Sequence, residues 1–169
     1  MAMLHRPERF DVPIEWAAEF ARKLRFGLLV SHLEGELQFS HLPVLVDVAD
    51  GRIGRIRGHL PRSNPHWQAL EQDPRATFVF NGPNAYMSAQ WYSPQCQAAP
   101  SWNFVTVHVV GRVRLLDTPE QTTEIVDELI ATNEAELPRQ WDIRGYSADR
   151  RARLTPHILR FAPHVQEGQ

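Results

Sequence analysis

The feature that most constrains this chain is a run of about ninety residues, 28–116, in which apolar and polar residues alternate with a period of two. Residues 36–41 and 104–110 show the alternation most clearly, and a period of two places successive side chains on opposite faces of a β-strand. The dipeptides Glu34-Gly35 and Asp50-Gly51 separate consecutive runs and are typical of tight turns. Consecutive strands joined by short turns are antiparallel, so the middle of the chain predicts β-hairpins.

Helical patterns flank these strands. A helix is expected over residues 14–25, between Asp11 and a stop at Gly27. A short helix follows Ser63 or Asn64 as its cap, and a long one opens at 118–121 with a buried stripe of Ile125, Val126, Leu129 and Ile130. A last helix is expected to begin at Ser147 and to end at Pro156. The strands are expected at 28–30, 37–41, 44–48, 53–58, 76–80, 85–89 and 104–116, with a turn at 81–84. Because strands and helices do not alternate, this order predicts a mainly β fold with flanking helices, closed as a small antiparallel barrel.

Composition narrows the class of protein. With 169 residues, of which 43% are hydrophobic, residues 1–169 form one globular domain without the need for disulfides or metals. The net charge of −2 lacks the strongly basic footprint of nucleic-acid binding, so any contact with DNA would come from a local patch. The single cysteine, Cys96, cannot form an internal disulfide. Because there is neither a membrane-length apolar run nor a signal-peptide core, a cytoplasmic protein without membrane contact is expected.

The densest group of unusual residues is 58–67, where a strand end meets a helix start. Unpaired backbone N–H groups at that helix start, beside the permanent charge of Arg62, would suit an anion such as a phosphate or a propionate. His59 could ligate haem iron, transfer protons or donate a hydrogen bond. In the plainer interpretation, Asn64 and Pro65 only cap the helix and Trp67 belongs to the core.

Aromatic residues gather in a second segment, which contains Tyr86, Trp91, Tyr92 and Trp102. Such flat side chains suit the walls of a pocket for a planar ring system, and they equally suit a dimer interface or the mouth of a barrel. With the first cluster, they define a candidate site for a small anionic ring ligand. The predicted cofactor-binding residues are His59, Arg62, Ser63, Asn64, Trp67, Tyr86, Trp91 and Trp102.

A series of ordered motifs over residues 3–145 resembles the PaiB family. The motifs are His5-Arg6-Pro7-Glu8-Arg9-Phe10, Ser40-His41-Leu42-Pro43, Gly58-His59 through Arg62, Asn64-Pro65-His66-Trp67, Gly82-Pro83 with Ala85-Tyr86, Trp91-Tyr92 and Trp102-Asn103. The resemblance implies an FMN-binding negative transcriptional regulator on the flavin-binding split barrel. It also implies a homodimer whose ligand sites lie at the subunit interface. Pro61, Phe104 and the ending at Gln169, without the basic tail common in the family, depart from its pattern.

Two functions are weighed at this stage, and oxidoreductase activity with the flavin is a third, weaker option because no distinctive proton donor is found. One is a non-catalytic, FMN-binding regulator that affects transcription directly or through a partner. The other is a haem-dependent enzyme, because the piperazate synthases, which form an N–N bond, resemble this family and use the histidine of the Gly-His motif as the axial iron ligand. Related split-barrel proteins also degrade haem. The matching position here is His59, which would be a metal ligand only in that case.

Overall fold

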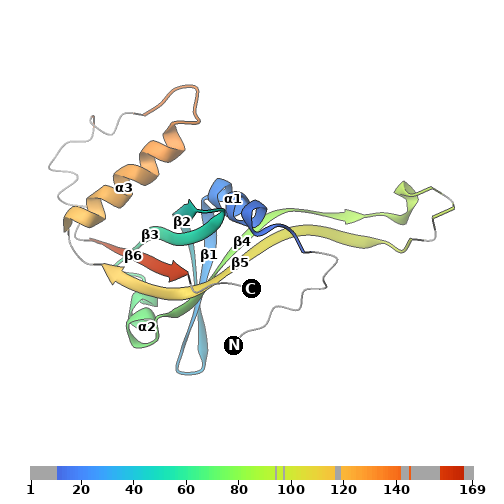
Figure 1. Ribbon diagram of the computed structural model, residues 1–169. Helices are drawn as coiled ribbons and strands as arrows, with labels where there is room; N and C mark the ends of the chain where they lie inside the picture. Colours follow the sequence, from blue (N-terminus) through green and yellow to red (C-terminus); the bar gives the residue numbers. More distant parts are fainter. Residues whose placement is uncertain are drawn as a thin grey trace.

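The computed structural model describes residues 11–93, 95–96, 98–116, 119–141, 145 and 157–165. Its elements run, in chain order, α1 (Ile14–Leu24), β1 (Phe26–Leu33), β2 (Glu36–Ala49), β3 (Arg52–Pro61), α2 (His66–Gln72), β4 (Arg75–Met87), the 3₁₀ turn η2 (Ala89–Trp91), β5 (Ser101–Leu116), α3 (Pro119–Glu134) and β6 (Ile158–Val165). Strands dominate the chain and helices flank them, as the alternating pattern predicts (Figure 1).

The strands form one closed barrel in the order β1-β2-β3-β6-β5-β4. Every neighbouring pair is antiparallel, and pairing of β1 with β4 closes the ring. The predicted antiparallel split-barrel class is therefore confirmed. The predicted turns at Glu34-Gly35 and Asp50-Gly51 are also confirmed, since all four residues have positive φ angles.

Strand β6 corrects the sequence analysis, which places no strand after residue 116. This strand inserts between β3 and β5, and its Leu159 and Phe161 are buried. Within this segment Pro163 interrupts the sequence pattern of a central strand. The signal is therefore too weak to stand out in the sequence. The helix expected from Ser147 lies outside the described residues.

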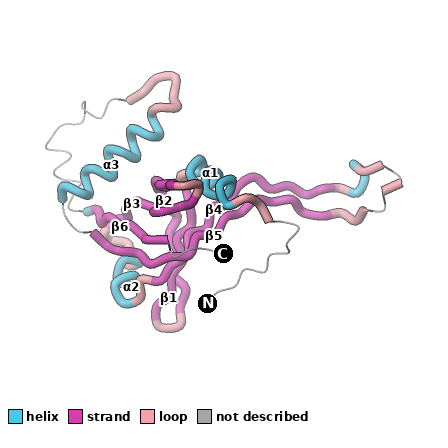
Figure 2. The backbone as a smooth tube through the Cα atoms, in the orientation of Figure 1, coloured by secondary structure: helices cyan, strands magenta, loops and turns pink. Residues whose placement is uncertain are grey.

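A second correction concerns residues 75–87. The Asn81–Asn84 segment is an irregularity within the single strand β4, where the register against β5 shifts, and not a turn between two strands. A bulge of this kind bends a strand without ending it. Beyond it, β4 and β5 continue as a two-stranded arm that projects from the barrel (Figures 1 and 2).

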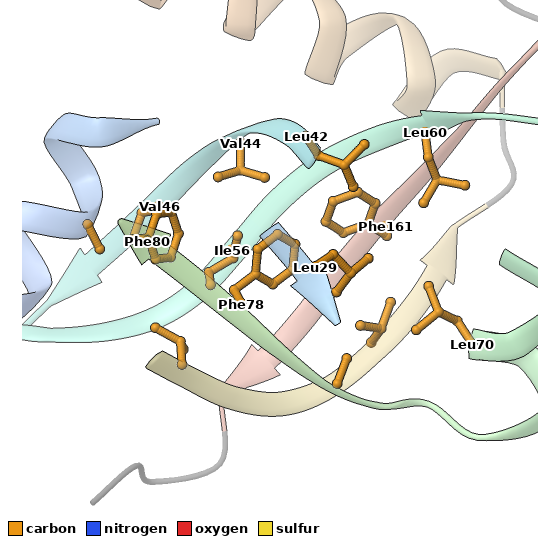
Figure 3. Packing of buried hydrophobic residues seen from close by; sticks show 14 of the residues in the cluster. Leu29, Leu42, Val44, Val46, Ile56, Leu60, Leu70, Phe78, Phe80 and Phe161 are labelled. Atoms are coloured by element: carbon orange, nitrogen blue, oxygen red, sulfur yellow. The ribbon is translucent and has the colours of Figure 1, made fainter. Parts of the chain in front are cut away.

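The core fills the inside of the barrel with one inward-facing side chain from every second strand position. Figure 3 shows these side chains converging from neighbouring strands. The fully buried members include Leu29, Val44, Ile56, Leu60, Phe78, Phe80 and Phe161. Burial of each such side chain stabilises the fold by about 1.5–3 kcal/mol relative to exposure.

Three α-helices cover parts of the barrel. Helix α1 contacts β2, β3 and β4, helix α2 contacts β1, β2 and β5, and helix α3 packs over β2, β3 and β6. The predicted helix at 14–25 is confirmed, although it ends in the left-handed conformation of Arg25 and not at Gly27. Ile125 and Leu129 of the predicted stripe pack on Leu45, which confirms the buried face of α3. Among the helices that the structure describes, none is both long and apolar enough to cross a bilayer.

Candidate functional site

The loop between β3 and α2 is held by backbone hydrogen bonds at both ends. Arg62 N donates to His157 O at 2.8 Å, and Asn64 N donates to Pro61 O at 2.9 Å. The indole Nε1 of Trp67 donates to Arg62 O at 3.0 Å. Arg62 and Ser63 nevertheless remain exposed. The loop therefore presents a cation and a hydroxyl to the solvent from a fixed backbone.

A buried histidine ties this loop to the barrel. His66 is 2% exposed, and its Nε2 and Nδ1 lie 2.8 Å from the hydroxyls of Ser31 and Ser40. Asn64 Nδ2 donates to the same Ser40 hydroxyl at 2.9 Å. If the Ser40 hydroxyl donates its hydrogen bond to Nδ1, His66 is neutral with its proton on Nε2, and each of these contacts has one donor and one acceptor. Burial lowers the pKa of His66, which favours this neutral form.

The plainer roles proposed for Asn64 and Trp67 are also seen. Asn64 Oδ1 accepts a hydrogen bond from His66 N at 3.0 Å, at the start of α2. Trp67 is half-buried and packs against the main core. Since its indole N–H already binds Arg62 O, Trp67 can offer a ligand its ring surface but no further donor. Cofactor binding by these two residues stays a prediction.

His59 lies apart from the loop, on the outer surface of the barrel. It alternates along β3 with the buried Gly58 and Leu60, so its side chain points away from the core. It pairs in register with Arg160 of β6, and α3 packs over these two strands. Its Nδ1 atom is buried and has no hydrogen-bond partner among the described residues, and burial lowers the pKa of the imidazole.

The predicted aromatic residues lie on the arm. Tyr86, Trp91 and Trp102 are 50%, 67% and 59% exposed. The rings of Tyr86 and Trp102 are 6.1 Å apart, and Trp102 Nε1 donates to Asn84 Oδ1 at 3.2 Å. Figure 1 places the arm and α2 on opposite sides of the barrel. Within one protomer, the structure therefore does not bring these aromatic residues to the loop that carries Arg62.

Several polar contacts around the site escape sequence reasoning. Arg57 hydrogen-bonds both Asp47 of β2 and Glu128 of α3, and it is separated by 71 residues from Glu128. Ser31 and Ser40 read in sequence only as strand residues, yet both contact His66. No local sequence motif predicts these hydrogen-bond partners, because they are distant in the sequence. Strand register and helix packing bring them together.

The barrel and its loop define the class of protein as a flavin-type split barrel, and comparisons with known proteins give the family. Residues 4–167 match the family described as "Putative FMN-binding domain". The chain belongs to this FMN-binding family, which confirms the resemblance to PaiB proteins and assigns FMN as cofactor. It is similar to "Protease synthase and sporulation protein PAI 2" of Bacillus subtilis (strain 168), with 32% identity over 123 residues. That match covers 72% of this chain and 58% of the relative.

Solved structures show the same fold at low sequence identity. The conserved hypothetical protein Rv2991 from Mycobacterium tuberculosis matches with a TM-score of 0.65 and 13% identity, over 97% of this chain and 87% of that one. The FAD and heme binding protein from Mycobacterium smegmatis matches with a TM-score of 0.57 and 13% identity, over 94% and 73%. At such identities the likeness concerns the fold alone.

The described residues suit FMN better than haem. Arg62 and Ser63 offer a charge and a hydroxyl to a phosphate from a loop whose backbone is fixed, and the aromatic residues can cover a flat ring. A haem bound through His59 would have to lie on the face that α3 covers, beside the side chain of Arg160. Iron ligation by His59 stays a prediction.

Proposed function

We propose that this protein is a homodimeric FMN-binding protein in which each flavin lies between the loop of one protomer and the arm of its partner. The observation that carries this proposal is the separation of the predicted site within one protomer. Arg62 and Ser63 lie at the end of β3, while Tyr86 and Trp102 lie on the projecting arm. A second copy would bring an arm to the loop and complete the site.

An apolar outer surface offers a place for the second copy. Phe39, Val30, Thr77 and Val110 occupy successive register positions across β2, β1, β4 and β5, so they share one face of the sheet. Phe39 is 58% exposed and Val110 is 42% exposed. Large exposed apolar surfaces mark interaction sites, and a self-complementary surface of this kind supports a twofold dimer.

When bound, FMN would supply a redox-active isoalloxazine ring, and the residues of this chain would hold it. Arg62 and Ser63 would bind the phosphate, and Tyr86 and Trp102 of the partner would cover the ring. We place this dimer in the cytoplasm as a regulator of transcription, a role supported by the family resemblance. Fluorescence anisotropy with duplex DNA tests that role, since backbone contacts give an affinity that falls with salt concentration. A regulator that acts through a protein partner would show no such dependence.

Subunit complementation tests the two-copy site directly. Arg62→Gln and Trp102→Ala each damage every site of a homodimer, so each variant alone should bind FMN more weakly. If one site uses both chains, a heterodimer of the two variants has one site with both native residues. Random mixing should then restore about a quarter of the native sites, measured by quenching of flavin fluorescence. A site contained within one protomer gives no recovery on mixing, and that result would overturn the two-copy arrangement.

A further inference from the structure

We propose that His59 and Arg160 form an oxyanion-binding site on the outer surface of β3 and β6, under helix α3, for a phosphoryl group. The two residues are partners in the register of these antiparallel strands. Directly opposite residues in a sheet point to the same side, with Cβ atoms about 4.5–5.5 Å apart. Their side chains therefore face the same small region between the sheet and α3.

Each of the two side chains contains one buried nitrogen atom without a hydrogen-bond partner among the described residues. His59 Nδ1 and Arg160 Nε are buried, and neither has a hydrogen bond within the part of the chain that the structure describes. A buried polar atom without a partner costs about 1–3 kcal/mol, so native proteins rarely leave one unexplained. Two such atoms on paired residues indicate a shared missing acceptor.

The surrounding charges favour an anion as that acceptor. Burial lowers the pKa of Arg160, and repulsion from Arg57 and Arg55 lowers it further. The acids nearby are already engaged: Asp47 and Glu128 both hydrogen-bond Arg57. Glu124 of α3 attracts Arg160, but no hydrogen bond joins the two side chains. An added anion would relieve the repulsion among the arginines as well as accept from Arg160.

The donor chemistry selects an oxyanion. Arginine can only donate, and its planar guanidinium matches the paired oxygens of phosphate and carboxylate groups. A neutral His59 with its proton on Nδ1 would donate to a second oxygen of the same group. A cation is excluded by the charge of Arg160. A water molecule could accept both hydrogen bonds but would leave the arginine repulsion in place.

This inference rests in part on the proposed function. His59 precedes Arg62 by three residues, which is about 10 Å along an extended strand. The phosphoryl group could therefore come from FMN held at the neighbouring loop, or from free phosphate. The site itself needs only the shared chemistry, and the experiment separates the two sources.

The test uses the full chain with inorganic phosphate as the probe. Sodium phosphate is added to the protein, and sodium chloride at equal ionic strength is the control. The Nε–H resonance of Arg160 is followed by NMR, and the midpoint of thermal unfolding is measured in parallel. Saturable movement of that resonance, with a rise in the midpoint, is expected. In Arg160→Gln, and in Arg160→Lys, which keeps the charge but loses the Nε donor, the apparent Kd is taken from the unfolding midpoint alone, and it should rise about tenfold or more. His59→Gln should weaken binding in the same direction.

Arg114→Gln is the matched control. Arg114 is an exposed arginine on the adjacent strand β5, so its loss removes the same charge from the same side of the barrel. Its apparent Kd should stay within about twofold of the native value, because exposed charges are screened. Without phosphate, the midpoint of thermal unfolding of Arg160→Gln should be no lower than that of the native protein, because the charge that Arg57 and Arg55 repel has been removed. If Arg160 had only a structural role, Arg160→Gln would instead lower the midpoint of thermal unfolding both with and without phosphate.

The outcomes separate the hypotheses. If phosphate leaves the Arg160 resonance unmoved, or if Arg114→Gln loses as much affinity as Arg160→Gln, the oxyanion site is wrong. A parallel titration compares FMN with riboflavin, which lacks the phosphate. Movement of the Arg160 resonance with FMN but not with riboflavin assigns the site to the flavin phosphate, and movement with free phosphate alone assigns it to a separate anion. If FMN binds while the Arg160 resonance responds neither to FMN nor to free phosphate, this inference is overturned and the proposed function stays intact.

Discussion

At the scale of single residues, His66 shows how a buried polar group both stabilises and positions. Its ring nitrogens contact Ser31 and Ser40, and Ser40 also accepts from Asn64 in the loop. Removing the ring leaves both hydroxyls without their buried partner. Gly58 is a second such position, because an added Cβ would lie 2.7 Å from Phe161 Cζ and 3.1 Å from Pro43 O. Each of these residues is required by neighbours that are distant in sequence.

His66 predicts a loss of stability in acid. The ordinary histidine pKa is 6.5, and burial lowers that of His66, so the unfolded chain takes up a proton first as the pH falls. The stability that neutral His66 contributes to the folded state is therefore fully present above pH 6.5. It is lost as the pH falls from 6.5 toward the pKa of His66 in the folded protein. In urea denaturation, His66→Gln should cost about 1–3 kcal/mol at neutral pH. It should also flatten the pH dependence of the free energy of unfolding below pH 6.5, whereas His41→Gln, at an exposed residue, should leave the free energy of unfolding at neutral pH unchanged.

At the scale of elements, α3 is fastened to the barrel at several points. Arg57 hydrogen-bonds Asp47 twice at 2.8 Å and Glu128 at 2.7 Å. Near the C-terminus of α3, Arg25 Nη1 donates to Thr132 O at 2.9 Å. The C-terminus of a helix carries a partial negative charge, which favours this contact. Arg25 thus joins the end of α1 to the end of α3.

Removing the hydrogen bonds of Arg57 to Asp47 and Glu128 should destabilise the protein. The Arg57 side chain is only 13% exposed. Its loss leaves Glu128 without this counter-ion and leaves Asp47 with Arg55 alone. We expect Arg57→Ala to lower the free energy of unfolding by about 2–3 kcal/mol, less than the loss at a fully buried ion pair. The comparison is Arg22→Ala, whose pair with Glu19 is exposed, so its loss should cost much less stability than the loss of Arg57. Equal losses in the two variants would contradict a special role for Arg57.

At the scale of the whole molecule, the outer face of the barrel exposes large apolar side chains such as Phe39 and Val110. The arm extends beyond the barrel (Figure 2). Helices α1, α2 and α3 pack elsewhere on the strands, and residues such as Phe26 and Phe39 remain more than half exposed. The arm carries Tyr86, Trp91 and Trp102 outward in the same manner. Both features are explained by the proposed second copy.

A charge placed on the apolar face should prevent dimerisation. Phe39→Asp puts a carboxylate within the proposed interface, where burial without a partner is costly. Sedimentation velocity should show a monomer, and FMN affinity should fall with the loss of the partner's arm. Leu137→Asp, at a residue that is 50% exposed near the end of α3, should remain dimeric and bind FMN normally. A dimer that survives Phe39→Asp would place the interface on another surface.

The sequence by itself determined the local elements. A period of two, turn residues with positive φ and the stripe on α3 are properties of neighbours in the chain, so the barrel class and its hairpins could be predicted. The loop around Arg62 could also be predicted as a candidate anion site, because its composition is unusual over ten residues. Three features could not be predicted in this way: β6 inserts between β3 and β5, β4 runs through its bulge, and His59 pairs with Arg160 on strands that α3 covers. These features depend on which distant strands pair and which face each presents, and a local pattern does not encode that choice.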